Sequence, residues 1–206
     1  MHEEQKKTAH VSKNRKVLML VAAIFVLPVV ASMTLYMTKW RPASTGNHGE
    51  LIQPVRPIGD KALRSLDGKP VNIRELHGKW TMVHFGASTC SDDCIKNLYY
   101  MRQVQAAQGK EADRMQRVFI VTDTKAAVAL KVKLADYPDM YVWTGGEKEL
   151  TALAQSFGAP DEKLAENQGI YLIDPLGNLM MRYAPGTDPA GMRKDIVRLL
   201  KYSWVG

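Results

Sequence analysis

The chain has 206 residues, of which 46% are hydrophobic and 24% are charged, a globular composition with room for one domain and an appendage. Its formal net charge is +7, but from Lys39 onward the basic residues are scattered, without a basic run or aromatic residues interleaved with them. This pattern argues against a nucleic-acid partner, and no motif indicates a small-molecule substrate.

The first element is an uncharged apolar segment, residues 17–37. At about 1.5 Å per residue, a helix of this length crosses a hydrocarbon core of about 30 Å. The run exceeds the apolar region of a signal peptide, and no clear Ala-x-Ala cleavage site follows it. We therefore expect one retained transmembrane helix.

Basic residues are concentrated before this segment, where five stand, and only Lys39 and Arg41 follow closely behind it. The positive-inside rule then predicts a cytoplasmic tail over residues 1–16 and a C-terminal domain on the other side of the membrane. The predicted location is the inner (cytoplasmic) membrane, with a periplasmic, extracytoplasmic domain.

Residues 38–57 are rich in Pro, Gly and small polar residues. Such a composition is typical of a tether, and we expect the ordered domain to occupy residues 58–206.

Apolar periodicity and turn residues predict strands alternating with helices through this domain. A hairpin is expected across Asp67-Gly68 and a second one across residues 174–177. The expected strands are 62–66, 70–73, 80–86, 117–122, 140–143, 169–173 and 179–183, and the expected helices are 94–107, 126–135, 148–157 and 189–202. This order predicts an α/β fold with a central mixed sheet flanked by helices.

Cys90 and Cys94, the only cysteines, stand where the strand 80–86 has ended and a helix begins. A spacing of four residues there permits a disulfide, and helix-start amides would stabilise thiolates. Thiolates serve both disulfide exchange and soft-metal binding, so the pair itself leaves redox chemistry and copper binding open. A local structural disulfide is the remaining alternative, but so short a loop restricts the unfolded chain little.

The order of elements, with a cysteine turn after the first long buried strand, resembles the thioredoxin fold. More narrowly, the chain resembles the Sco/SenC family of membrane-anchored copper proteins that help assemble cytochrome c oxidase. The resemblance rests on Asp67-Gly-Lys-Pro70, residues 76–80, Phe85-Gly86, Cys90-x-Asp92-x-Cys94 and Tyr171-Leu-Ile-Asp-Pro-x-Gly177.

In that family, copper is held by the two cysteines and by a histidine just before the Tyr-Leu-Ile-Asp strand. The corresponding segment here, residues 164–171, contains no histidine. The resemblance therefore implies Cys90 and Cys94 as ligands for copper(I), with no third ligand identified. His84, six residues before Cys90, is a candidate replacement ligand or proton donor, although an ordinary buried histidine is the simpler interpretation.

Other polar or sulfur-bearing residues are weaker candidates. Asp92 and Asp93 suit the first turn of a helix, and His77 suits a surface turn. Met180 and Met181 are expected to serve core packing, with one of the pair buried. Glu166, Asn167 and Gln168 occupy the place of the family's histidine, but their hard donors suit copper(I) poorly.

We expect the chain to be a membrane-anchored thiol–disulfide protein of Sco-like type that assists copper-site maturation of a respiratory oxidase. In this interpretation Cys90, the more exposed cysteine, attacks a partner disulfide and Cys94 resolves the product. The first alternative is a copper(I) chaperone that holds the ion with both cysteines. The second is a non-catalytic domain that binds an oxidase subunit. Whether the chain is a thiol–disulfide oxidoreductase in the enzymatic sense stays open at this point.

Overall fold

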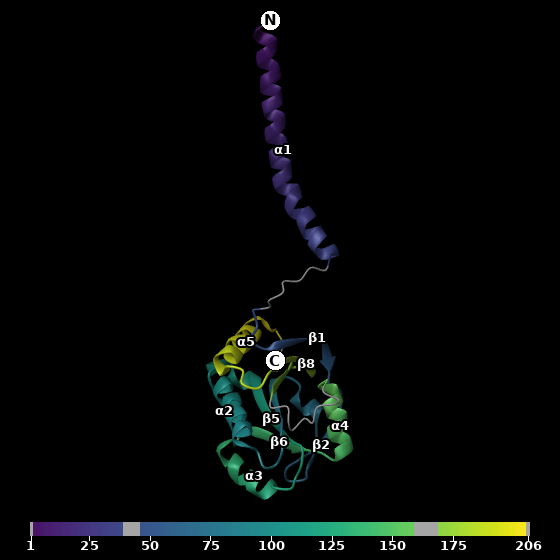
Figure 1. Cartoon of the computed structure of the whole chain (residues 1–206), viewed down its shortest axis with the longest axis vertical. Coiled ribbons are helices and arrows are strands. Elements are labelled where there is room, and N and C mark those ends of the chain that lie inside the picture. Colours follow the sequence, from purple (N-terminus) through teal and green to yellow (C-terminus); the bar gives the residue numbers. More distant parts are fainter. Residues whose placement is uncertain (1, 39–45, 159–168, 205–206) are drawn as a thin grey trace. The chain divides into compact units, whose positions relative to one another are not determined.

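The computed structural model describes residues 2–38, with side chains from Arg15 onward, and residues 46–158 and 169–204 (Figure 1). The chain divides into two compact units, Met1–Gly46 and Asn47–Gly206.

The first unit contains one helix, α1 (His2–Met37), and its part from Arg15 to Met37 is apolar and long enough to cross a membrane. The helix also includes most of the predicted tail. Residues 2–16 contain no Pro or Gly and several strong helix formers, so the helix can continue through them.

The second unit begins earlier than predicted. We expected an irregular tether up to residue 57, but β1 (Glu50–Pro57) pairs antiparallel with β8 (Asn178–Tyr183), so the C-terminal end of the tether prediction is wrong. Pro54 and Pro57 make this strand difficult to recognise in the sequence, because proline has no backbone N–H to donate to a β-ladder. An edge strand tolerates proline, and β1 is one of the two edge strands of the sheet.

The domain is built on an eight-stranded sheet of order β1-β8-β7-β4-β5-β6-β2-β3. The sheet is mixed, which confirms the fold class that the alternating pattern predicts. Two antiparallel hairpins, β2–β3 and β7–β8, form where the turn residues indicate. The remaining strands are β2 (Ala62–Ser65), β3 (Pro70–Asn72), β4 (Trp80–Gly86), β5 (Met115–Val121), β6 (Met140–Thr144) and β7 (Ile170–Ile173).

Strands β4, β5 and β6 run parallel, in a register that sets Trp80 opposite Met115 and Gly86 opposite Val121. Their carboxyl ends therefore meet at one edge of the sheet, and the loops that follow them share that edge. Cys90 lies on the first of these loops, and Cys94 lies in the first turn of the helix that follows it.

Helices cover both faces of the sheet (Figure 1). One apolar core joins β4 and β5 to the helices α2, α3 and α5, and the other joins the opposite sheet face to α4. Period-two alternation along β4 assigns Met82 to the first core and Val83 and Phe85 to the second. The helical segments are α2 (Asp92–Ala106), α3 (Ala127–Lys133), α4 (Glu147–Ser156) and α5 (Pro189–Tyr202), with short 3-10 turns η1 (Ile73–Leu76), η2 (Gly109–Arg114) and η3 (Leu134–Asp136).

Candidate functional site: the cysteine turn

The cysteine turn, residues 87–91, connects the carboxyl end of β4 to α2. Its backbone closes through a hydrogen bond of 3.0 Å from the Cys90 amide to the Ala87 carbonyl oxygen. Cys90 has a φ of 36°, the only positive value among the non-glycine residues that the structure describes. Such a conformation is unfavourable for an L-residue, and its presence beside a reactive group is typical of functional sites.

The helix begins at Asp92, two residues before the start at residue 94 that the sequence predicted. Ser91 is the N-cap of α2, and its hydroxyl accepts a hydrogen bond of 3.4 Å from the Cys94 amide. Cys94 therefore lies in the first turn of the helix, whereas Cys90 precedes the cap. Asp92 and Asp93 occupy the first turn, where carboxylates complement the positive helix end.

Cys90 and Cys94 form a disulfide, with a Cα–Cα distance of 5.2 Å. Both residues are buried: Cys90 is 1% exposed and Cys94 is 4% exposed. The expectation that Cys90 is the more exposed cysteine is therefore wrong for the oxidised protein. The turn folds Cys90 back into the first core, beside the side chains that α2 contributes.

Cys94 packs tightly against the end of β4. A Cβ atom at Gly86 would lie 3.3 Å from the Cys94 Sγ and 3.0 Å from the Phe119 ring. The absence of a side chain at residue 86 thus makes room for the disulfide against the sheet.

The neighbouring loop after β5 holds the turn in place through Asp123. The Asp123 carboxylate accepts hydrogen bonds from the amide and the hydroxyl of Ser88, and the Ser88 hydroxyl accepts a hydrogen bond of 2.9 Å from the Ala126 amide. The bond from the Ser88 hydroxyl lowers the pKa of the Asp123 carboxyl below its ordinary value. Ser88 itself is buried, so this pair fixes the turn to the start of α3.

A cation lies beside the same turn. Lys133, in the last turn of α3, donates hydrogen bonds of 2.7 Å to the carbonyl oxygen of Thr89 and 3.0 Å to that of Cys90. Its charge would favour a thiolate in the reduced protein, in addition to the effect of the α2 amino terminus.

His84 is fully buried in β4 and stacks on Phe119, with 5.8 Å between ring centroids. Its Nδ1 lies 2.9 Å from the Gly169 carbonyl oxygen. A carbonyl only accepts, so Nδ1 carries the proton and Nε2 presents a lone pair. This Nε2 is buried and has no hydrogen-bond partner among the described residues, and burial lowers the pKa of the imidazole, which is therefore neutral at pH 7.

The other candidate residues fall outside the cysteine turn. His77 caps η1 and is exposed, as predicted. Met181 is buried and Met180 is half-buried against the same core, which fits the packing role. Glu166, Asn167 and Gln168 lie outside the described residues.

At the cysteine turn, only the two cysteine side chains are ligands that suit a soft ion. Two reduced thiols provide the ligands that copper(I) prefers. In the part of the chain that the structure describes, no three His, Cys, Asp or Glu side chains are grouped to hold a metal ion. These residues therefore fit a two-coordinate thiolate site.

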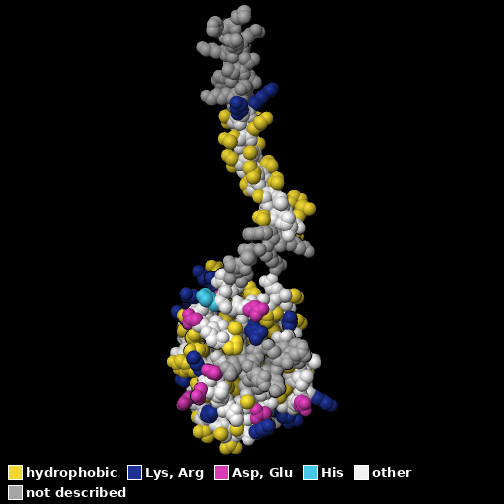
Figure 2. Space-filling model, in the orientation of Figure 1, with side chains coloured by type: hydrophobic (Ala, Val, Ile, Leu, Met, Phe, Trp, Pro, Cys, Tyr) yellow, Lys and Arg dark blue, Asp and Glu magenta, His cyan; other side chains and the backbone are white. Residues whose placement is uncertain are grey.

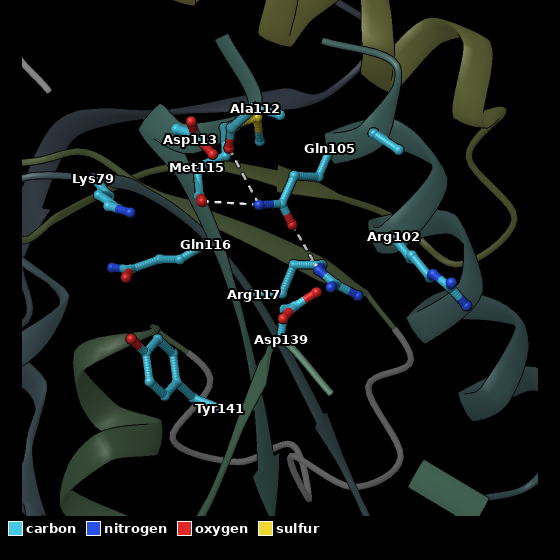
Figure 3. A pocket seen from close by; sticks show the side chains of 11 residues that line it. Lys79, Arg102, Gln105, Ala112, Asp113, Met115, Gln116, Arg117, Asp139 and Tyr141 are labelled. Carbon is cyan, nitrogen blue, oxygen red and sulfur yellow. Dashed lines mark hydrogen bonds between the residues drawn. The ribbon is translucent and has the colours of Figure 1, made fainter. Parts of the chain in front are cut away.

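A polar cavity of about 380 Å³ lies at the opposite ends of the same strands, far from the cysteines along β4 (Figure 3). Gln105 spans its wall by donating to the carbonyl oxygens of Ala112 and Met115 and accepting from Arg117. Arg117 is 4% exposed, and burial lowers the pKa of its guanidinium. This network joins α2 to the start of β5 and does not reach the cysteine turn.

Sequence reasoning missed Ser88, Asp123 and Lys133. Asp123 had a usable signal, since it follows the strand after β4 and parallel strands bring their carboxyl-end loops together. Lys133 had none, because one lysine among many on helices does not stand out.

Comparisons with known proteins agree with this geometry. Residues 80–203 match the family model described as "Transmembrane-like, thioredoxin-like, C-terminal domain". An SCO2-like protein of Rickettsia felis is 26% identical over 157 residues, which cover 69% of this chain and 75% of that protein.

Two solved structures share the fold. Bradyrhizobium japonicum ScoI with copper bound is 25% identical, with a TM-score of 0.53, covering 68% of this chain and 97% of that one. BsSco is 20% identical, with a TM-score of 0.58, covering 73% of this chain and 96% of that one. It is described as a member of the Sco family of cytochrome c oxidase assembly proteins in which a disulfide switch was identified.

The matched family model spans more than half of the sequence and includes both cysteines, the strands β4–β8 and the helices α2–α5. The chain accordingly belongs to this transmembrane-like, thioredoxin-like family, and it is a divergent relative of the Sco/SenC proteins.

Proposed function

We propose that the chain is a membrane-anchored thiol–disulfide protein that prepares the copper site of a respiratory cytochrome c oxidase. The observation that carries this proposal is the Cys90–Cys94 disulfide at the start of α2. The relatives add the biological setting, since one of them is described as an oxidase assembly protein with a disulfide switch.

The anchor in this proposal is the apolar part of α1, from Arg15 to Met37. The excess of Lys and Arg before that segment favours a cytoplasmic N-terminus, which puts the domain and its cysteines on the periplasmic side. Disulfides persist in such an oxidising compartment.

In the reduced protein, Cys90 is the better nucleophile of the pair. It lies outside the helix, with the Lys133 ammonium on its carbonyl oxygen, whereas Cys94 packs against Gly86. The Cys90 thiolate attacks one sulfur of a partner disulfide, forms a mixed disulfide and releases the first partner thiolate.

The Cys94 thiolate then attacks the Cys90 sulfur, closes the Cys90–Cys94 disulfide and releases the second partner thiolate. The partner gains two electrons, and this chain loses two. A dithiol protein must reduce Cys90–Cys94 again before the next round. Both sulfurs are buried in the oxidised protein, so the reductant must first open the cysteine turn.

A second candidate function is that of a copper(I) chaperone, which the copper-bound Bradyrhizobium relative favours. Cys90 and Cys94 would hold the ion as a thiolate pair and deliver it as cargo. His84 is a candidate third ligand because its Nε2 lone pair is buried without a partner in the described residues. The ring of Phe119, on which His84 stacks, belongs to the same buried cluster as both cysteines.

The two functions separate in one experiment on the full chain in detergent. The reduced protein is titrated anaerobically with copper(I) against a competing chelator, beside Cys90→Ser, Cys94→Ser and His84→Phe. The thiol-exchange function predicts weak uptake by the wild type and a trapped mixed disulfide with a partner in Cys94→Ser, through the remaining Cys90 thiol.

Tight, stoichiometric uptake that both serine variants abolish would make the chaperone function the correct one, and loss in His84→Phe would identify the third ligand. If the protein takes up no copper and Cys94→Ser traps no partner, both functions are overturned. A domain that binds an oxidase subunit without chemistry then remains.

A further inference from the structure

The polar cavity at the other end of the strands from the cysteines is lined by a buried cation, Arg117 in β5. This residue is 4% exposed, and its Nε donates a hydrogen bond of 2.7 Å to the neutral Oε1 of Gln105. Its Nη1 is buried without a hydrogen-bond partner among the described residues. In the same part of the chain, no carboxylate forms an ion pair with this guanidinium. A buried arginine is costly unless a negative charge lies beside it.

The cavity has two acidic side chains at its rim, where its lining residues are exposed. These are Asp113 and Asp139, and two basic residues, Lys79 and Arg102, are exposed at the same rim. The rim charges therefore balance, and Arg117 gives the whole lining an excess of one positive charge. Burial lowers the pKa of the Arg117 guanidinium, and this effect exceeds the opposing effect of the Asp139 charge.

Charges on the outer surface of the domain are less favourable places for an anion to bind. Figure 2 shows Lys and Arg side chains interspersed with Asp and Glu side chains on the face of the domain that it presents. Such exposed charges are screened by salt, whereas a buried charge acts in a medium of lower dielectric constant. The strongest attraction for an anion is therefore expected inside the cavity, at Arg117.

The floor of the cavity is fixed before any ligand arrives. Gln105 donates to two backbone carbonyl oxygens while it accepts from Arg117 (Figure 3). Gln116, the preceding residue of β5, donates hydrogen bonds of 2.8 Å to the Leu76 carbonyl oxygen and 2.9 Å to the Thr81 hydroxyl. Side chains held in this way lose little entropy when a ligand binds. The cavity volume of about 380 Å³ is that of a small-molecule site.

We propose that this cavity binds a small monocarboxylate, whose oxygens accept hydrogen bonds from the Arg117 guanidinium. A planar guanidinium matches a carboxylate in geometry, and one negative charge cancels the excess of one positive charge in the lining. The two rim carboxylates repel a dianion such as phosphate. A water molecule satisfies an N–H group but brings no charge. The site shares no residue with the cysteine turn and goes beyond the proposed function.

The test uses the full oxidised chain in detergent, with acetate as the probe. The N–H signal of the Arg117 Nε is followed by NMR during titration with sodium acetate, at an ionic strength kept constant with sodium chloride. We expect a saturable shift, and phosphate should require a several-fold higher concentration to produce it. Arg64→Gln, which removes an exposed arginine outside the cavity, is the matched control and should bind acetate like the wild type.

Two variants of the cavity give opposite results if the proposal is correct. The backbone amide signals of β5 report binding in both. Arg117→Gln should abolish the saturable shift. Asp139→Asn removes a carboxylate that repels the ligand and should tighten acetate binding several-fold. If Arg117→Gln does not fold, Asp139→Asn and the wild type decide between the outcomes.

Binding that appears only in Asp139→Asn would overturn the proposal, because the Asp139 carboxylate would then take the position of the ligand in the wild type. Tighter binding of phosphate than of acetate would also overturn it, as would a shift that chloride alone reproduces. Cys90→Ser should bind acetate like the wild type. A failure of this proposal therefore leaves thiol exchange and copper uptake untouched, and their failure leaves the cavity untouched.

Discussion

The Lys133 ammonium donates a hydrogen bond of 3.0 Å to the carbonyl oxygen of Cys90, so α3 brings a positive charge to the cysteine turn. Replacing it by Lys133→Gln removes a charge that favours thiolate, and the apparent pKa of the reduced thiol pair should therefore rise. Thiolate absorbance at about 240 nm against pH measures this. The control is Lys131→Gln, on the same helix as Lys133. It removes a lysine that is paired with Asp67 and should leave the thiol titration unchanged.

Ser88 is the buried link between the cysteine turn and the loop that contains Asp123. Ser88→Ala leaves the Ala126 amide without its acceptor and should lower the free energy of unfolding by about 1–3 kcal/mol. Denaturant unfolding of the oxidised protein checks this value. Ser156→Ala, which removes a hydroxyl that bonds within α4, should cost less than about 0.5 kcal/mol. Equal losses in the two variants would contradict a special role for Ser88.

The fold could be predicted from the sequence where pattern and turn chemistry agree. Helix α5 has the predicted bounds, and the Asp67-Gly68 hairpin forms because glycine accepts the positive φ of its turn. Strand β1 could not be predicted, since its partner β8 lies more than a hundred residues away and its prolines suggest an irregular segment. Local periodicity contains no information about such a pairing.

The candidate site, like the fold, could be predicted only in part. The two cysteines are recognisable because their type and spacing determine their chemistry. Their burial depends on the positive φ of Cys90 and on the space at Gly86, and Lys133 comes from another helix. These are tertiary contacts, which residue spacing does not encode.

His84 should make stability depend on pH in the mildly acidic range. Burial lowers the folded-state pKa of its imidazole below the unfolded value of about 6.5, so the unfolded chain takes up a proton more readily. Stability contributed by the neutral imidazole is therefore present above about pH 6.5 and is lost as the pH falls below it.

Urea unfolding at about pH 7.5 and about pH 5.5 tests this sign. The wild type should lose stability between the two values, and His84→Phe should lose less. His77→Gln, at an exposed histidine, should keep the wild-type dependence. A His84→Phe curve that runs parallel to the wild type would contradict the prediction.

Asp195 fixes the first residues of the domain to α5. Asp195→Ala leaves the His48 and Gly49 amides without their acceptor, and we expect a loss of about 2–4 kcal/mol in the free energy of unfolding. Hydrogen exchange of these two amides should accelerate more than that of the β4 amides. Asp113→Ala, at an exposed carboxylate, is the matched control and should change neither quantity.

The pairing of β1 with β8 has a practical consequence for where the chain can be cut. A fragment that begins at Ile58, where the sequence suggested order starts, would lack β1 and would expose the backbone of β8, whose side chains Met181 and Tyr183 are buried in the core. An unpaired apolar strand of this kind recruits strands from other molecules and promotes aggregation. The prolines of β1 cannot donate to a further strand, so in the whole chain β1 acts as a natural terminator of the sheet.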